Sequence, residues 1–401
     1  MKLLESYVFI RNQSKIICEK LEVEDYVVQP AEFVSPPKWH LAHTSWFFEN
    51  IILKKYLSNY RVYKEEFDHL FNSYYKSLGS HWMQSERGFL SRPTVKEVYQ
   101  FREHVDAGMT KLLSSSEVDS KIFKLIEIGL HHEQQHQELL LMDIKYILGL
   151  NPSMPALSHN PAHPYKENPE QWSDQREGVF EFGTSDKSKF SFDNESPRHQ
   201  EFIQAHQISN YFVTNGEYLK FVNDGGYNDS RLWLAKGWDW VKQNNINKPL
   251  YWYENDNTLF EYTLLGATKI NPLSPVSHVN YFEADAFARW SGNRLPTEFE
   301  SEIFMSKNLN LFNDEGISFH SKSNEIIFNN LWWWTSSSYQ AYPGFTSFEG
   351  SLGEYNGKFM CNQYVLKGGC FGTAQGHLRE TYRNFYYPEQ NWMFSGIRLA
   401  N

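Results

Sequence analysis

The hydrophobic and polar positions divide the chain into two parts of different character. Up to about residue 150, Leu, Ile and Phe recur at three- and four-residue spacing with few glycines, which predicts long helices. From about Val179 onward, short β-type runs alternate with Gly, Asn and Asp turns, which indicates an α+β domain with little regular structure. Five of the 16 prolines crowd between these parts, and prolines at that density cannot continue a helix. We therefore predict an α+β protein with a helical domain at 1–150, a linker at 151–178 and a second domain at 179–401.

Composition and charge narrow the class of protein. Hydrophobic residues make up 41% and charged residues 21% of the 401 residues, as in soluble globular proteins. The net charge of −10 argues against nucleic acid or an anionic membrane surface as the main partner. No secretory signal opens the chain, and no apolar run approaches the roughly 20 residues that cross a bilayer. We therefore expect a cytoplasmic protein. Its aromatic content of 17% predicts pockets lined by rings.

A histidine pair is the sharpest local signal, and it lies in a helical pattern that runs from Lys121 to about Leu148. His132 and His136 are one helical turn apart on the same stripe as the apolar positions. Two imidazoles on a buried face favour a metal pair, with two hydrogen-bonded core histidines as the alternative. The stripe as a whole contains Ile122, Leu125, Gly129, His132, His136, Leu139 and Asp143.

A third ligand has to come from another helix. Ser35-Pro36-Pro37 has the form of a helix N-cap followed by proline at the first helical position. The helix that it opens carries His40 and His43, which are about 60° apart around the axis, so spacing alone does not choose between them. Three neutral imidazoles suit Zn(II), Fe(II) or Cu(II).

These residues resemble the iron-binding motifs of the sulfoxide synthases of ergothioneine biosynthesis. The match rests on Leu41-Ala42-His43 and on the run from His132 to Glu138, about 90 residues later. The resemblance implies a DinB-like four-helix bundle at the N-terminus. It also implies Fe(II) as the cofactor, held by His43, His132 and His136, with His40 and His131 dispensable for binding.

The second half resembles the formylglycine-generating-enzyme, or sulfatase-modifying-factor, fold, which is C-type-lectin-like. Lys367-Gly-Gly-Cys370 stands where the family usually has Arg-Gly-Gly-Ser. The only other cysteines are Cys18 and Cys361, and Cys361 and Cys370 do not fit the copper-binding pair of true formylglycine-generating enzymes. The motifs that carry the resemblance are Phe192-Asp-Asn-Glu-Ser-Pro197, Phe212-Val-Thr-Asn215, Gly225-Gly-Tyr227, Arg294-Leu-Pro-Thr-Glu298 and Gly396-Ile-Arg-Leu399.

The resemblance implies an O2-dependent enzyme that joins a thiol to the imidazole of hercynine (Nα-trimethylhistidine) and forms a sulfoxide. Gln135 and Asn384 correspond to family positions that bind hercynine, and amides can hydrogen-bond its carboxylate directly or through water. The trimethylammonium group should sit against ring faces, for which Phe385 and Tyr386 are candidates. Arg383 belongs to the same run and is included among the substrate-binding residues.

The resemblance extends to a proton donor for oxygen reduction and to a clamp for the thiol substrate. Tyr74 and Tyr75 resemble the paired tyrosines of one subgroup, and ordinary loop tyrosines are the alternative. Arg87 and Arg92 flank a segment that faces the thiol in relatives, so either could bind its carboxylate as a bidentate partner. Solvated arginines are the alternative for both.

The C-terminal run predicts the identity of the thiol. Relatives that use γ-glutamylcysteine have an Arg-Asn-Trp-Asp run near the C-terminus. This chain has Arg383-Asn-Phe-Tyr386 at that place and lacks the acidic residue. A buried ammonium without a counter-charge costs roughly a few kcal/mol, so we predict L-cysteine as the partner of hercynine. The alternatives are γ-glutamylcysteine, a selenosugar as in selenoneine-forming relatives, and a lectin-like binding module without catalysis.

Overall fold

The chain forms two compact units in the computed structural model. One comprises residues 1–157 with 348–355, and the other comprises 158–347 with 356–401. The first is helical and the second is rich in short strands, which confirms the predicted α+β class. The structure describes residues 3–73, 75, 79–159, 165–167, 171–186, 188–309, 316–321, 328–350, 353 and 356–401.

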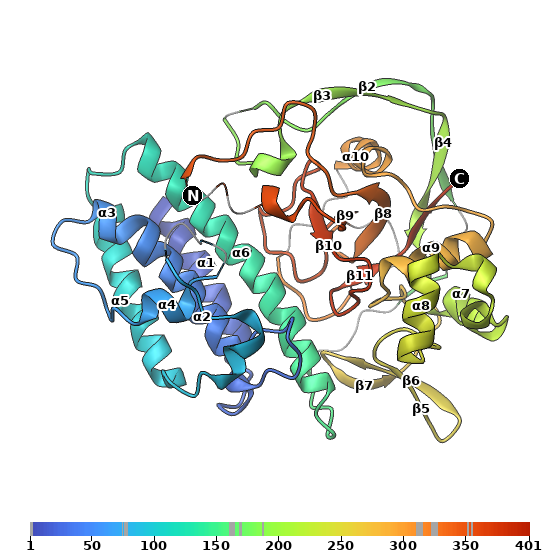
Figure 1. The fold of residues 1–401 in the computed structure, drawn as a ribbon, viewed down its shortest axis with the longest axis horizontal. Helices are drawn as coiled ribbons and strands as arrows, with labels where there is room; N and C mark the ends of the chain where they lie inside the picture. Colours follow the sequence, from blue (N-terminus) through green and yellow to red (C-terminus); the bar gives the residue numbers. More distant parts are fainter. Residues whose placement is uncertain are drawn as a thin grey trace. The chain divides into compact units, whose positions relative to one another are not determined.

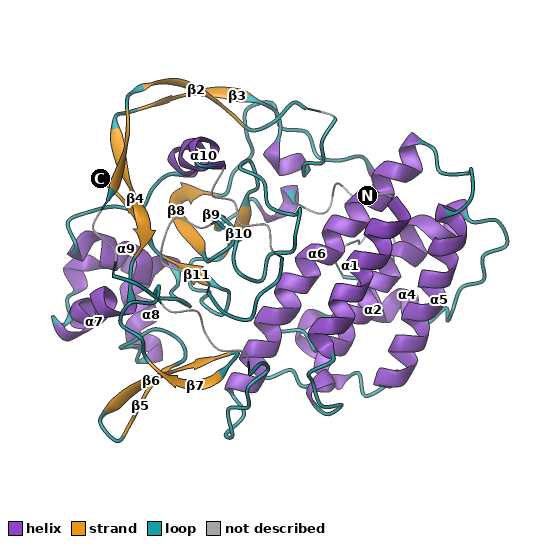
Figure 2. Ribbon diagram, turned by 180° about the vertical axis from the view of Figure 1, so that it is seen from behind, coloured by secondary structure: helices purple, strands orange, loops and turns teal. Residues whose placement is uncertain are grey.

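The first unit is built on four long helices that lie side by side, as expected of a four-helix bundle (Figures 1 and 2). They are α1 (Leu3–Cys18), α2 (Pro37–Phe47), α5 (Val95–Leu113) and α6 (Ser120–Gly149). Among its described residues the unit also has two short α-helices, α3 (Lys54–Tyr56) and α4 (Phe67–Phe71), and a π-helical turn at Phe48–Leu53 joins α2 to α3.

Local hydrogen bonds explain where these helices begin. The Thr94 and Asp119 side chains cap α5 and α6 by accepting backbone N–H bonds from Glu97 and Ile122. Helix α2 begins at Pro37, one residue after the predicted start, and its N-cap is Pro36 rather than Ser35. The Ser35 hydroxyl instead accepts a 2.7 Å hydrogen bond from Nη1 of Arg87, so the predicted cap is wrong.

The second unit contains four helices, α7 (Asn215–Asn223), α8 (Ala235–Asn244), α9 (Tyr281–Trp290) and α10 (Glu298–Lys307), within its described residues. Its strands pair in four small sheets, ordered β1-β4-β12, β10-β9-β8-β11, β2-β3 and β5-β6-β7. Strand β1 lies within the segment predicted as a linker. The strands are β1 (Trp172–Gln175), β2 (Gly178–Phe182), β3 (His199–Ile203), β4 (His206–Phe212), β5 (Trp252–Asn255), β6 (Thr258–Thr263), β7 (Gly266–Lys269), β8 (Trp332–Ser338), β9 (Tyr364–Lys367), β10 (Asn384–Tyr386), β11 (Ser395–Gly396) and β12 (Arg398–Ala400).

Large aromatic side chains fill the centre of the second unit. Strand β8 is flanked by β9 and β11, and its three consecutive tryptophans, Trp332, Trp333 and Trp334, are all buried. Because successive side chains of a strand point to opposite faces, the tryptophans pack against both sides of the sheet. The indole N–H groups of Trp333 and Trp334 donate to Ser301 Oγ and to the Val279 carbonyl, which satisfies them in the core.

Capping boxes fix the starts of α7, α9 and α10, whereas α8 has no side-chain cap. Thr297 accepts from the backbone N–H of Glu300, whose carboxylate accepts from the Thr297 N–H in return. The same arrangement opens α7 and α9.

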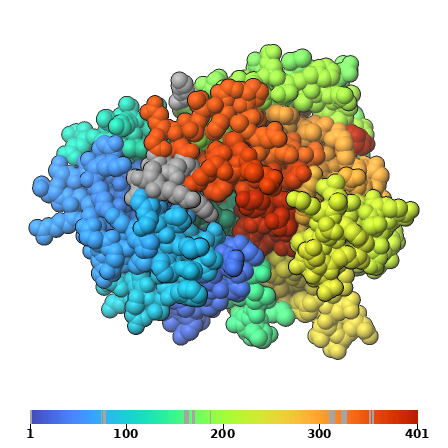
Figure 3. Space-filling view, viewed as in Figure 1, coloured from blue at the N-terminus to red at the C-terminus, as the bar shows by residue number. Residues whose placement is uncertain are grey.

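The β5-β6-β7 sheet protrudes from the rest of the unit (Figure 3, yellow). Among the helices that the structure describes, none has the length and apolar character of a membrane span.

Candidate metal centre

Two helices of the bundle bring three histidines together. His43 lies on α2, and His132 and His136 lie one turn apart on α6. One ring nitrogen from each lies within 4.8 Å of the other two. His43 and His132 are buried, and His136 is partly exposed. The structure thus places together the three residues that the sequence and the family resemblance select.

Hydrogen bonds orient two of the rings. Nδ1 of His43 donates to the Phe71 carbonyl at 2.6 Å, because a carbonyl can only accept. The Nε2 lone pair of His43 is therefore directed into the cluster, where it faces Nε2 of His132 at 3.2 Å. Nδ1 of His136 lies 2.9 Å from Nδ1 of His40, so Nε2 of His136 is left for the cluster.

A column of stacked side chains holds His43 in place. Its ring is parallel to Trp39, at 4.5 Å between centroids, and to Trp46, at 5.8 Å, with 11° between the planes in both cases. Tyr75 stacks on Trp46 at 5.5 Å, and the guanidinium carbon of Arg87 lies 3.3 Å from the Trp39 ring centroid. A buried cation–π contact of this kind stabilises by about 2 kcal/mol. The column restricts His43 to one orientation.

The three imidazoles are neutral at physiological pH. Burial lowers the pKa of His132 to about 3. Burial, followed by the neighbouring histidines, holds the pKa values of His43 and His136 well below their usual range. A neutral imidazole keeps one lone pair, which is the form that binds a metal.

The cluster fits a divalent transition metal. Two nitrogens 3.2 Å apart must share a proton or a cation, and two ligands bound at right angles at about 2.1 Å lie about 3 Å apart. Three imidazoles without thiolate or carboxylate suit Fe(II), Zn(II) or Cu(II). The residues present therefore fit a metal held by His43, His132 and His136.

Other predicted site residues of the helical unit differ in their surroundings. Arg87 is buried, and it donates to Ser35 and Ser73 through its two terminal nitrogens. Arg92 is exposed and donates to the carbonyl of Ser91. Tyr75 is buried in the stacked column, and Gln135 is half-buried on α6 beside His136. Tyr74 lies outside the described residues.

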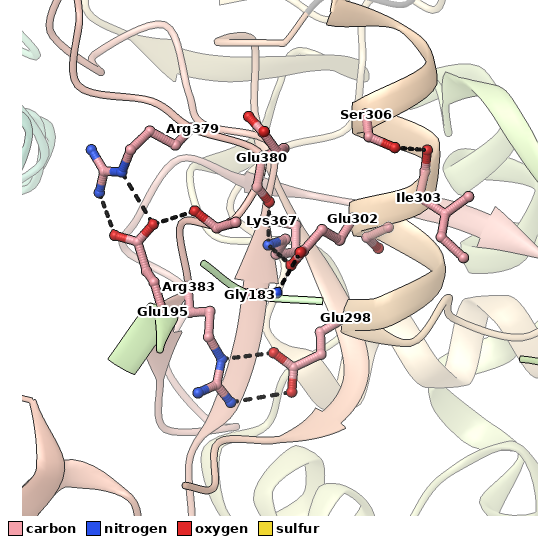
Figure 4. Close-up of polar contacts among 12 residues, drawn as sticks. Gly183, Glu195, Glu298, Glu302, Ile303, Ser306, Lys367, Arg379, Glu380 and Arg383 are labelled. Atoms are coloured by element: carbon pink, nitrogen blue, oxygen red, sulfur yellow. Dashed lines mark hydrogen bonds and ion pairs between the residues drawn. The ribbon is translucent and has the colours of Figure 1, made fainter. Parts of the chain in front are cut away.

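The remaining predicted residues are in the second unit, with Arg383 directly before β10 and the other three on it. Arg383 is buried and donates hydrogen bonds of 2.7 and 3.2 Å to Glu298 (Figure 4). Its guanidinium carbon lies 4.0 Å from the centroid of the Tyr342 ring. Asn384 and Phe385 are half-buried, and Tyr386 is buried against Trp392. Phe385 stacks on Tyr339 with ring centroids 4.1 Å apart. Arg383 is therefore part of a buried ion pair that holds β10 to α10.

The side chains that hold the metal ligands in place could not be predicted from the sequence. Trp39 and Trp46 were part of the predicted α2 helix, but their stacking on His43 depends on rotamers that spacing does not give. Asp143 was on the predicted stripe of α6, and it proves to bind Nε2 of His40 at 2.9 Å. Its position two turns beyond His136 was the available signal.

Comparisons with known proteins give one matching domain family and several relatives of the chain. Residues 163–309 match the family model of the sulfatase-modifying factor enzyme 1-like domain. The chain is 29% identical over 314 residues to a hercynine oxygenase of Mycobacterium tuberculosis, covering 70% of this chain and 72% of that protein. It is 32% identical over 244 residues to a hercynine oxygenase of Mycolicibacterium smegmatis, covering 52% and 56%. A third, from Mycolicibacterium thermoresistibile, is 29% identical over 317 residues, covering 67% of each.

Proposed function

We propose that this chain, a homologue of the hercynine oxygenases, is an O2-dependent sulfoxide synthase that joins the imidazole of hercynine to the thiol of L-cysteine. The observation that carries the proposal is the cluster of His43, His132 and His136 in a chain with these relatives. A lectin-like binding module would not require three neutral imidazoles with converging lone pairs. The cluster therefore favours catalysis over binding alone.

Fe(II) is the proposed metal, held by His43, His132 and His136. When bound by three protein ligands, it supplies open positions at which a thiol, an imidazole and O2 can be brought together. The chain contributes the orientation of the ligand nitrogens. The Phe71 carbonyl and the two tryptophans fix His43, so the ligand set needs little rearrangement to receive the metal.

Tyr75 is our proposed proton donor for oxygen reduction, with Tyr74 as the other candidate. The Tyr75 ring is buried and stacks on Trp46, which itself stacks on the ligand His43. This contact keeps the phenol close to the cluster and in a fixed plane. A phenol can donate a proton and retain its place through packing of the ring.

Arg87 is our proposed partner of the thiol substrate's carboxylate. Its side chain packs on Trp39 beside His43, whereas Arg92 is exposed and contacts the neighbouring Ser91 carbonyl. An ordered guanidinium binds a carboxylate at a smaller entropy cost than a solvated one.

The proposed hercynine-binding residues are Gln135 in the helical unit and Asn384, Phe385 and Tyr386 in the second unit, with Arg383 in support. An amide can hydrogen-bond a carboxylate, and an aromatic ring can face a trimethylammonium group. Phe385 is half-buried and stacks on Tyr339, whereas Tyr386 is buried against Trp392, so Phe385 is the more accessible of the two rings. The Arg383–Glu298 ion pair would keep the β10 backbone in place.

L-cysteine is the proposed thiol because no carboxylate occurs in Arg383-Asn-Phe-Tyr386 to bind a γ-glutamyl amine. The test is a product assay with hercynine, Fe(II), O2 and a panel of cysteine, γ-glutamylcysteine and a selenosugar, read by mass spectrometry. We expect the cysteine conjugate sulfoxide, with kcat/KM for cysteine at least about tenfold above that for γ-glutamylcysteine. A preference for γ-glutamylcysteine or the selenosugar would overturn the thiol assignment. Absence of any product would overturn the proposed activity.

A further inference from the structure

A buried chain of three side chains leads away from His136. Nδ1 of His136 lies 2.9 Å from Nδ1 of His40, and Nε2 of His40 lies 2.9 Å from Oδ2 of Asp143. His40 and Asp143 are both only 3% exposed. Asp143 is held in turn by the backbone N–H of Ser35, which donates to Oδ2 at 2.9 Å.

The direction of the hydrogen bonds in this chain follows from its acid end. An ionised carboxylate can only accept, so Nε2 of His40 carries the proton that it donates to Asp143. The other nitrogen of a neutral His40 is then an acceptor, and the proton between the two imidazoles belongs to Nδ1 of His136. That arrangement leaves the lone pair of His136 on Nε2, toward His43 and His132.

We propose that His40 and Asp143 are positioning residues for the metal centre, which act by fixing the tautomer and ring orientation of His136. The inference rests on the proposed three-histidine metal site. It assigns a role to His40, which the family resemblance implies is dispensable for metal binding. His40 does not replace His43 as a ligand, because both of its nitrogens are engaged, one by His136 and one by Asp143.

The groups that accept the Nδ1 protons of His43 and His136 differ in charge. His43 donates its Nδ1 proton to an uncharged backbone carbonyl, whereas His136 donates to an imidazole that is itself bound to a carboxylate. A hydrogen bond toward a negative charge increases the electron density on the opposite nitrogen. We therefore infer that His136 is a stronger donor to the metal than it would be without Asp143.

The experiment measures metal affinity without substrates. Metal-free protein is titrated with Co(II), whose visible absorption reports ligand number and geometry, in the parent and in His40→Phe, His40→Asn and Asp143→Asn. His40→Phe keeps a ring but removes both hydrogen bonds, and we expect Kd to rise about 10- to 100-fold. His40→Asn retains an acceptor near the Nδ1 position, so its Kd should rise less than about tenfold. His104→Phe is the control, since His104 is a half-buried histidine of α5 that bonds the Arg61 carbonyl and is not part of the cluster.

Each outcome separates this inference from the proposed function. If the parent binds one Co(II) and His40→Phe binds it equally well, His40 has no positioning role. If His40→Phe loses Co(II) as completely as His43→Ala, His40 is a ligand and the inference is also wrong. If the parent binds no Co(II), the three-histidine centre itself fails. Melting of the metal-free variants shows whether an effect is structural, and Asp143→Asn carries the test if His40→Phe does not fold.

Discussion

Replacing Glu133 with Gln should destabilise the helical unit strongly, although Glu133 does not face the metal. It follows His132 on α6, and its side chain is fully buried. Its carboxylate accepts 2.8 Å and 2.7 Å hydrogen bonds from Arg11 and Ser14 of α1, and it is ion-paired with Arg102 of α5. These arginines hold the pKa of Glu133 below its usual range against the opposing effect of burial. One carboxylate thus joins three of the four long helices.

The size of the effect follows from the charges in the network. Arg11 and Arg102 are balanced by Glu133 and by Asp106, which binds Nε of Arg11 at 2.7 Å. Glu133→Gln leaves one buried positive charge without a counter-charge and places an amide NH2 against a guanidinium. Removing one member of a buried pair costs about 3–5 kcal/mol. For a unit of this size the melting temperature should fall by about 2–4 °C per kcal/mol.

Calorimetric melting of the full chain at pH 7 is the assay, and Glu103→Gln is the matched control because Glu103 is exposed on α5. We expect the helical unit of Glu133→Gln to melt at least about 6 °C below that of the control. Arg102→Met combined with Glu133→Met should recover part of the loss, because it removes both charges together. Equal melting of Glu133→Gln and Glu103→Gln would refute the reasoning.

Two further predictions concern Tyr75 and Glu283. Tyr75→Phe should keep substrate binding, because the stacked ring remains. The ratio of sulfoxide to side products should fall, because the proton-donating hydroxyl is lost. Sulfoxide formation at the parental rate in both Tyr75→Phe and Tyr74→Phe would place the proton donor elsewhere. Burial raises the pKa of Glu283 from 4.5 to about 7, so the Glu283 carboxyl holds its proton more tightly in the folded second unit than in the unfolded chain. The free energy of unfolding should therefore fall by about 3 kcal/mol as the pH rises from 4.5 to 7. Glu283→Gln, which resembles the protonated side chain, should be the more stable protein at pH 8 by thermal melting, and a parent–variant difference that does not change with pH would contradict this.

The position of the histidine pair could be predicted from the sequence because one long helix repeats its buried face without interruption. The expected helix from Lys121 to Leu148 is observed as Ser120–Gly149. The choice between His40 and His43 could not be made from the residues, since both are buried, as is every residue of α2. The groups that separate them, the Phe71 carbonyl and Asp143, come from other elements.

The second unit could be predicted in class, but not in its sheets. The Thr297 capping box is local, and its motif is visible in the sequence. Strand β11 has two residues and pairs in parallel with β8, more than 60 positions earlier, so alternation of side chains gives no signal for it. The Ser35 cap failed for a related reason, because the Arg87 side chain, far away in sequence, occupies the hydroxyl.

Anaerobic titration of metal-free protein with Fe(II) tests the central claim most directly, with His43→Ala and His131→Ala measured beside the parent. The account predicts one Fe(II) per chain in the parent and in His131→Ala, and no stoichiometric binding in His43→Ala. Undiminished binding of Fe(II) by His43→Ala would contradict the three-histidine centre.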